Sequence, residues 1–244
     1  RYDLMIKCIR TDIAIFREEN IPLQVEEAKL ETEHSTITGA MTVEFEGEEK
    51  TLPQMAIYLE SIDRDLREAA WRAVVERMSR DTERLSEIYD EQIRIRHRIA
   101  VNAGFDDYRS YIFEAKHRYD YSMDDCLEFH DSIERVCVPM MHEIQEHRRG
   151  ALGVATLRPW DVSEKSGGGV DVHGRPPLRP FDDVERLITG CSSVFHRMSP
   201  ELGGMFDMLR EKDSLDLESR KGKAPGGYQA NLEKTRIPFI FMNA

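Results

Sequence analysis

Apolar residues recur at helical spacing along most of the chain. Between residues 63 and 103 they stand three, four or seven positions apart, and arginine and glutamate fill many of the positions between them. This period predicts an amphipathic helix, and Gly104 is a typical C-terminal stop. The stripe weakens between Met78 and Leu85, so the pattern allows two helices as well as one. The apolar positions are Leu66, Ala70, Val74, Met78, Leu85, Ile88, Ile95 and Ile99.

Two further helices have recognisable N-termini. Ser122 and Asp125 have the spacing of a capping box, in which the hydroxyl accepts from a backbone N–H and the carboxylate reaches back. A helix is predicted from there to about Arg149. Ser199 followed by Pro200 combines a capping hydroxyl with proline at the first helical position. The periodicity predicts other helices at about 2–18, 22–37, 53–60, 106–115 and 182–197.

Strand patterns are few. Residues 42–45 alternate, 46–49 can turn, and 50–52 can return, which predicts one small β-hairpin. Further strands are predicted near 214–218 and 236–242. Residues 158–180 lose the helical period in a run rich in glycine and proline, which indicates a long surface loop. The predicted fold class is therefore mainly α: a multi-helix lobe with one small β-hairpin near 42–52 and a short strand pair near the C-terminus.

The charge balance narrows the class of partner. With 46 acidic and 34 basic residues, the chain carries a formal net charge of -12. Such a chain is repelled on average by nucleic-acid backbones and anionic membranes, so we expect no nucleic-acid and no membrane partner. No apolar run approaches the roughly 18 to 20 residues that span a bilayer. The sequence reads as that of a soluble protein.

The cysteines and the chain ends add two expectations. The four cysteines are scattered without any C-x-x-C pair, which favours reduced thiols in a cytoplasmic protein. The chain begins with Arg1 and ends on an apolar run, Phe239 to Ala244, so both ends look like cuts within a longer sequence. Apolar surface left uncovered by such a cut, including Phe239–Phe241, predicts possible self-association. The cysteines are Cys8, Cys126, Cys137 and Cys191.

Histidines do not form a recognisable metal site. His142, Glu143 and His147 resemble the zinc motif H-E-x-x-H, but its histidines are four residues apart and these are five apart. Five residues correspond to about 140° around a helix, so the two rings point to different faces. His130 and Glu134 are four residues apart and share a helix face, but one such pair is expected by chance in a helix with many acidic residues. Solvated helix faces explain these residues without any metal.

Two segments near the C-terminus suggest a binding role. Gly226 and Gly227 follow a proline, and without a Cβ they allow a sharp turn or close approach to a ligand, although ordinary loops contain such pairs too. Residues 238–244 read as a buried strand, or as an edge strand that pairs with an extended peptide. The pattern does not choose between these readings. No G-x-S-x-G, G-x-G-x-x-G or phosphate-loop spacing occurs, so the residues alone indicate a mainly helical domain of unknown activity.

Several segments, in order, resemble the oligoendopeptidase F branch of the M3 zinc metallopeptidases. The most specific are Lys221-Gly-Lys-Ala-Pro-Gly-Gly-Tyr228 and Pro238-Phe-Ile-Phe-Met-Asn-Ala244. The resemblance covers nearly the whole chain. Gln229 departs from it, because a small or thiol residue commonly follows this tyrosine in the family. The other matching segments are 37–47, 51–54, 58–61, 63–71, 88–90, 104–109, 157–161 and 216–220.

The resemblance implies a largely helical, two-lobed enzyme that hydrolyses internal bonds of short peptides. Its zinc is held by an H-E-x-x-H helix and a later glutamate, and the zinc-bound water is the nucleophile. In the family that helix follows the strand matched by residues 238–244, and the printed sequence stops before it. We therefore expect residues 1–121 to form an N-terminal helical region with the hairpin, and 122–244 to begin the catalytic domain.

The same resemblance places the site residues. No catalytic or metal-binding residue is expected in this chain, and zinc is expected only in the full-length enzyme. The expected substrate-binding residues are Gly226, Gly227 and Tyr228 as a close-approach loop, with Asn243 and Ala244 as the end of a substrate-pairing edge. The chain alone is predicted to be inactive. Two alternatives stay open: a non-catalytic helical interaction domain with an acidic surface, and a different helical hydrolase whose metal is held by scattered histidines.

Overall fold

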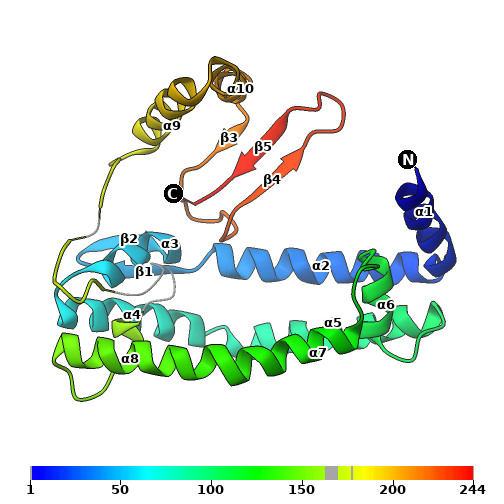
Figure 1. The fold of residues 1–244 in the computed structure, drawn as a ribbon, viewed down its shortest axis with the longest axis horizontal. Helices are drawn as coiled ribbons and strands as arrows, with labels where there is room; N and C mark the ends of the chain where they lie inside the picture. The colour runs from blue at the N-terminus through cyan, green and yellow to red at the C-terminus, as the bar shows by residue number, and fades with distance from the viewer. Residues whose placement is uncertain (1, 163–169, 177, 244) are drawn as a thin grey trace. The chain divides into compact units, whose positions relative to one another are not determined.

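The computed structural model describes residues 2–162, 170–176 and 178–243. Helices dominate it, and two small sheets complete it (Figure 1). The chain divides into two compact units, which we describe separately: Arg1–His34 with Asp81–Thr156, and Ser35–Arg80 with Leu157–Ala244. The expected division between residues 121 and 122 concerns the domains of a larger enzyme and stays a prediction. No helix in the described ranges combines the length and apolar character needed to cross a bilayer.

The first unit is helical, and its apolar core lies among α1, α2, α5 and α6, whereas the later helices of the unit contain no buried residue. Ile95 and Ile99 stand four apart on α5 and therefore bury the same helix face, where they meet Leu23 of α2 and Tyr111 of α6. The side-chain amide of Asn20 donates to the Ile99 carbonyl at 3.0 Å inside this core. The elements are α1 (Asp3–Ile15), the first part of α2 (Asn20–Gly39), α5 (Thr82–Asn102), α6 (Tyr108–Ala115), α7 (Met123–Ser132), η2 (Ile133–Cys137) and α8 (Val138–Leu152).

The helix predicted over 122–149 is confirmed as a continuous run with one irregular turn. Ser122 and Asp125 form the predicted capping box. The π turn η2 precedes Pro139, which has no N–H to donate to the previous turn, and a proline of this kind distorts the helix before it. Gly153, with a φ of 66°, ends α8 in the left-handed conformation.

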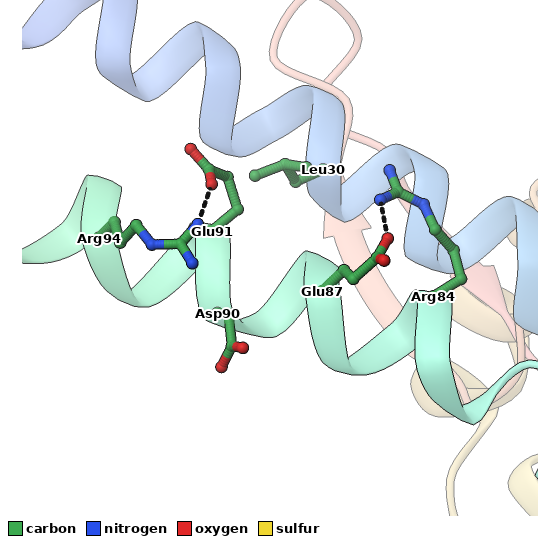
Figure 2. A pocket seen from close by; sticks show the side chains of 6 residues that line it. All are labelled: Leu30, Arg84, Glu87, Asp90, Glu91 and Arg94. Atoms are coloured by element: carbon green, nitrogen blue, oxygen red, sulfur yellow. Dashed lines mark hydrogen bonds and ion pairs between the residues drawn. The ribbon is translucent and has the colours of Figure 1, made fainter.

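A charged notch lies between α2 and α5 in this unit (Figure 2). Arg84 binds Glu87 at 2.9 Å, and Arg94 binds Glu91 at 2.5 Å. In each of these exposed pairs the two opposite charges belong to the same helix and neutralise one another. Few uncompensated charges are therefore left in the notch to bind a ligand. The lining residues are Leu30, Arg84, Glu87, Asp90, Glu91 and Arg94.

The second unit contains both sheets. In the first sheet β1 and β2 pair antiparallel, and Glu46 and Gly47, both with positive φ, form the two-residue turn between them. Val43, Met55 and Ala70 form the buried cluster beneath this hairpin. The elements are β1 (Thr42–Phe45), β2 (Glu48–Thr51), α3 (Leu52–Met55), η1 (Ala56–Glu60), α4 (Arg64–Ser79), η3 (Pro159–Asp161), α9 (Val184–Met198), α10 (Pro200–Glu211), β3 (Leu215–Asp216), β4 (Tyr228–Asn231) and β5 (Pro238–Phe241).

A buried carboxylate fastens η3 to the start of α4. Asp161, fully buried, accepts from Arg64 Nε and Nη2 at 3.0 and 2.9 Å and from Arg67 Nη2 at 3.1 Å. Arg67 also donates to the Trp160 carbonyl at 2.8 Å. Burial alone would raise the pKa of Asp161, but the hydrogen bonds from Arg64, the Arg158 N–H and Arg67 outweigh it and lower that pKa.

Helices α9 and α10 form a hairpin held by a polar cluster. His196 Nε2 lies 2.6 Å from Asp207 Oδ2, and the Ser192 hydroxyl donates to Asp207 Oδ1 at 2.8 Å. Gly203 lies under the imidazole ring, where a Cβ would be only 2.3 Å from His196 Nδ1. A side chain at this position would therefore displace the His196 ring from its place beside Asp207.

Most predicted helices are confirmed. The segment 63–103 is two helices, α4 and α5, which is the alternative that the weak apolar stripe between Met78 and Leu85 allowed. The predicted strand pair near the C-terminus is a three-stranded sheet, because β4 was not foreseen. Part of the predicted long loop, 163–169 and 177, lies outside the described residues.

Candidate functional site

The three-stranded sheet contains the segments that the sequence marked as binding candidates. Its strand order is β3-β5-β4, with β3 parallel and β4 antiparallel to β5. β5 is thus the central strand, paired on both sides, and cannot be the substrate-pairing edge expected over 238–244. β4 is an edge strand, its four residues are all exposed, and its outer side pairs with no strand of the described chain (Figure 1).

The direction of each backbone group on β4 follows from the hydrogen bonds of β5. The N–H groups of Ile240 and Met242 donate to β3, at the carbonyls of Ser214 and Asp216. Successive residues of a strand point their backbone groups to opposite sides, so Phe239 and Phe241 face β4. Their register partners, Ala230 and Tyr228, must then face β5. The remaining two residues, Gln229 and Asn231, direct both N–H and C=O to the open edge.

The glycines of the adjoining loop have structural reasons to be glycine. Gly226 has a φ of +94°, a backbone conformation in which any residue with a side chain would be strained. A Cβ on Gly227 would lie 3.0 Å from the Phe241 carbonyl oxygen. The close approach expected of this pair is therefore made to the protein's own central strand. A Gly227→Val change would disturb the sheet, so it would not report on substrate contact.

The other expected site residues take different places. Tyr228 begins β4 with an exposed ring that stacks nearly parallel on Phe241, their centroids 4.9 Å apart. The Asn243 amide donates to the carbonyls of Ala224 and Gly226 at 3.0 and 2.8 Å, so its side chain fastens the loop. Ala244 lies outside the described residues.

A buried lysine connects the loop to both neighbouring strands. Lys223 Nζ lies 3.0 Å from both the carbonyl and a carboxylate oxygen of Asp216, 2.8 Å from the Glu218 carbonyl and 2.6 Å from the Met242 carbonyl. Its side chain is 1% exposed. Hydrogen bonds from Arg220, assisted by Lys223 and opposed by burial, lower the pKa of Asp216 to about 2.

Two contacts anchor the loop to the rest of its unit. The Gly222 N–H donates to the Gly39 carbonyl at 2.8 Å, and the Ser219 hydroxyl lies 2.9 Å from that of Thr51. The loop is thus held at its start, at its lysine and at its glycines. The outer edge of β4 was missed from the sequence because Tyr-Gln-Ala-Asn is only four residues long, and its alanine and asparagine are not enriched in strands.

The described residues do not fit a zinc site. No three His, Cys, Asp or Glu side chains within the described ranges lie close enough together to hold a metal ion. His142 and His147 both lie exposed on α8, as their spacing suggested. No residue of this part of the chain is therefore given a role in metal chemistry.

A family comparison decides what kind of protein this sheet belongs to. The model of peptidase family M3 matches residues 57–244. The chain belongs to peptidase family M3. The fold resembles a crystal structure assigned as an oligoendopeptidase F from Bacillus anthracis str. Ames, with 25% identity and a TM-score of 0.89. PZ peptidase A with an inhibitor matches at 29% identity and a TM-score of 0.89.

Length separates this M3 chain from those structures. Another structure assigned as an oligoendopeptidase F has 27% identity and a TM-score of 0.89. In each comparison the match covers 99% of this chain but only 41% to 43% of the other. The chain thus spans less than half the length of these structures. No curated protein matches it. The expected relation to the oligoendopeptidase F type and the expected mainly helical fold are both confirmed.

Proposed function

We propose that this chain supplies the peptide-binding wall of a zinc-dependent oligoendopeptidase that hydrolyses internal bonds of short peptides. Membership of peptidase family M3 supports the reaction class. The observation that carries the binding role is the open edge of β4, where the backbone groups of Gln229 and Asn231 pair with no strand of the described residues. An extended peptide adds to such an edge as a further strand.

Backbone pairing suits an enzyme that accepts many sequences. Hydrogen bonds to N–H and C=O groups are the same for almost every residue of a peptide, so they give affinity without selecting side chains. The exposed ring of Tyr228 adds an apolar contact at one end of the edge. Gln229 and Asn231 therefore replace Asn243 and Ala244 as the proposed substrate-pairing residues, and Tyr228 is kept.

Zinc belongs to this proposal only through residues outside the described part of the chain. The family's H-E-x-x-H motif does not occur in the printed sequence. This polypeptide alone should not hydrolyse a quenched fluorescent peptide, with or without added Zn²⁺. Zinc-dependent turnover by the purified chain would overturn this part of the proposal.

Amide hydrogen exchange, read by NMR, tests the edge directly. In the free chain the N–H groups of Gln229 and Asn231 should exchange quickly, and those of Tyr228 and Ala230, which face β5, should exchange slowly. An excess of an unstructured peptide of about eight residues should slow the first pair selectively. The same peptide N-methylated at alternate residues is the control, because it cannot donate along one edge. Equal exchange at Gln229 and Asn231 with and without peptide would refute pairing here.

A matched proline pair separates binding from folding. Proline removes a backbone N–H, and edge strands tolerate it where that N–H faces solvent. Gln229→Pro should keep the sheet and weaken peptide binding at least about tenfold, the loss expected from one or two hydrogen bonds. Ala230→Pro should disrupt β4 itself. If Gln229→Pro binds the peptide as the parent does, the edge is not the binding surface.

Partners and location follow as further parts of the proposal. We expect short peptides as substrates and no nucleic-acid or membrane partner, in a cytoplasmic setting that keeps the cysteines as thiols. Self-association also stays a prediction, to be read by sedimentation velocity. Phe239–Phe241 are partly covered within the central strand, so they offer less surface for it than the sequence suggested.

A further inference from the structure

The buried ammonium of Lys223 joins parts of the chain that are otherwise held by few bonds. Its acceptors come from the end of β3, from the following loop and from the residue after β5. The parallel pairing of β3 with β5 involves only two residue pairs. A cation in contact with all three segments therefore holds the end of β3, the loop that follows it and the end of β5 together.

The same residue sets the path of the chain into β4. Only four residues separate Lys223 from Tyr228, where β4 begins. Lys223 Nζ lies 4.5 Å from the centre of the Phe241 ring, and Tyr228 stacks on that ring at 4.9 Å. The Asn243 amide binds the carbonyls of Ala224 and Gly226, which lie in the chain between Lys223 and Tyr228. The ammonium, the two rings and the loop thus determine the position of β4 against β5.

We infer that Lys223 is a positioning residue for peptide binding. It is buried and makes no contact with the open edge, so it acts by holding β4 in the register that turns Gln229 and Asn231 outward. The inference rests on the proposed function of that edge. Its structural half, the dependence of β4 on a buried ammonium, can be measured without any peptide.

The test compares two nearby lysines. Lys223→Met keeps an unbranched side chain of similar length but removes every donor. Lys221→Met is the control, because the Lys221 side chain is 59% exposed and its ammonium pairs with Glu49 at 2.6 Å, at the surface of the described structure. In the full chain, Lys223→Met should speed the exchange of the Ala230 amide at least about tenfold and weaken binding of the same peptide of about eight residues by a similar factor. Lys221→Met should change neither.

A chemical rescue separates positioning from simple packing. Lys223→Cys can be alkylated in denaturant and refolded, either with bromoethylamine or with bromopropane, while the parent chain is treated in parallel. The two products have side chains of equal length that end in an ammonium or in a methyl group. Only the ammonium product should restore slow exchange of the Ala230 amide and the affinity for the peptide. This comparison stays valid if Lys223→Met fails to fold.

The outcomes distinguish the two proposals. Parental Ala230 exchange and affinity in Lys223→Met, or equal rescue by both alkylated products, would overturn the role of Lys223. If the parent chain binds no peptide, the proposed edge fails. In that case the exchange of Ala230 in the two alkylated products still decides whether the ammonium positions β4.

Discussion

Removal of the Asp161 carboxylate should destabilise the second unit strongly, and much more than removal of an exposed carboxylate. Asp161→Ala leaves Arg67 with its side chain only 3% exposed and without its anionic partner. Arg64, whose side chain is 37% exposed, can turn toward water, so the loss of the carboxylate costs it less interaction energy. Arg67 retains its carbonyl partners at Ser61 and Trp160, which satisfy donors but do not neutralise the charge.

The size of the effect follows from the burial of the stranded cation. Removal of one partner of a buried pair typically costs about 3 to 5 kcal/mol, because an uncompensated charge stays in a poorly polarisable environment. With a urea dependence of about 2 kcal/mol per molar, the unfolding midpoint should fall by roughly 2 M. Asp161→Asn preserves the shape and some hydrogen bonds, so it should cost less.

Tryptophan fluorescence is a specific assay for this change. The only two tryptophans, Trp71 and Trp160, lie 5.4 Å apart between ring centres beside the carboxylate, so urea unfolding monitored by their emission reports this unit. Asp182→Asn is the control, because its ion pair with Arg186 is exposed at both ends and should be worth under about 1 kcal/mol. A loss below about 1 kcal/mol for Asp161→Ala would show that Arg67 does not depend on the carboxylate.

Two further predictions concern stability. Gly203→Ala should displace His196 from Asp207 and lower the melting temperature, whereas Gly204→Ala, with no atom within 4 Å of its Cβ, should raise it, since alanine favours helix by about 1 kcal/mol. Equal shifts would contradict the packing of this hairpin. Asp216 has its pKa lowered from 3.8 to about 2, chiefly by Arg220, so its stabilising effect is present above pH 4 and lost as the pH falls toward 2. Asp216→Asn should therefore be less stable than the parent by about 1 to 2 kcal/mol at pH 6, and this difference, measured by urea unfolding, should shrink at pH 2.5.

Local patterns predicted the helices well because their causes lie within a few residues. The Ser122 capping box, the Ser199-Pro200 start and the break between Met78 and Leu85 each depend on neighbouring side chains and backbone, and each is present in the structure. The rejection of His142 and His147 as a metal pair used the same kind of reasoning, from angles around one helix.

The candidate site was predicted less well because it depends on pairing between distant segments. The apolar run at 238–241 correctly indicated a strand, but a single strand's sequence does not state how many neighbours it has. The four exposed residues of β4 are too few, and too poor in strand-forming side chains, to mark a strand by themselves, and they become one through pairing with β5. The sequence therefore suggested an edge strand over 238–244, whereas in the structure β5 is central and β4 is the neighbouring edge strand.

From the sequence alone came the mainly helical class, most helix boundaries, the family resemblance and the choice of the segment from Lys221 to Tyr228 as a binding candidate, since these depend on period, caps and motifs along the chain. Tertiary structure decided that Gly227 meets the carbonyl of Phe241, that Lys223 is a buried cation, and that β5 is the central strand while β4 is an edge strand. Sheet order and burial arise from contacts between residues far apart in sequence, and no local pattern records which partner each strand will meet.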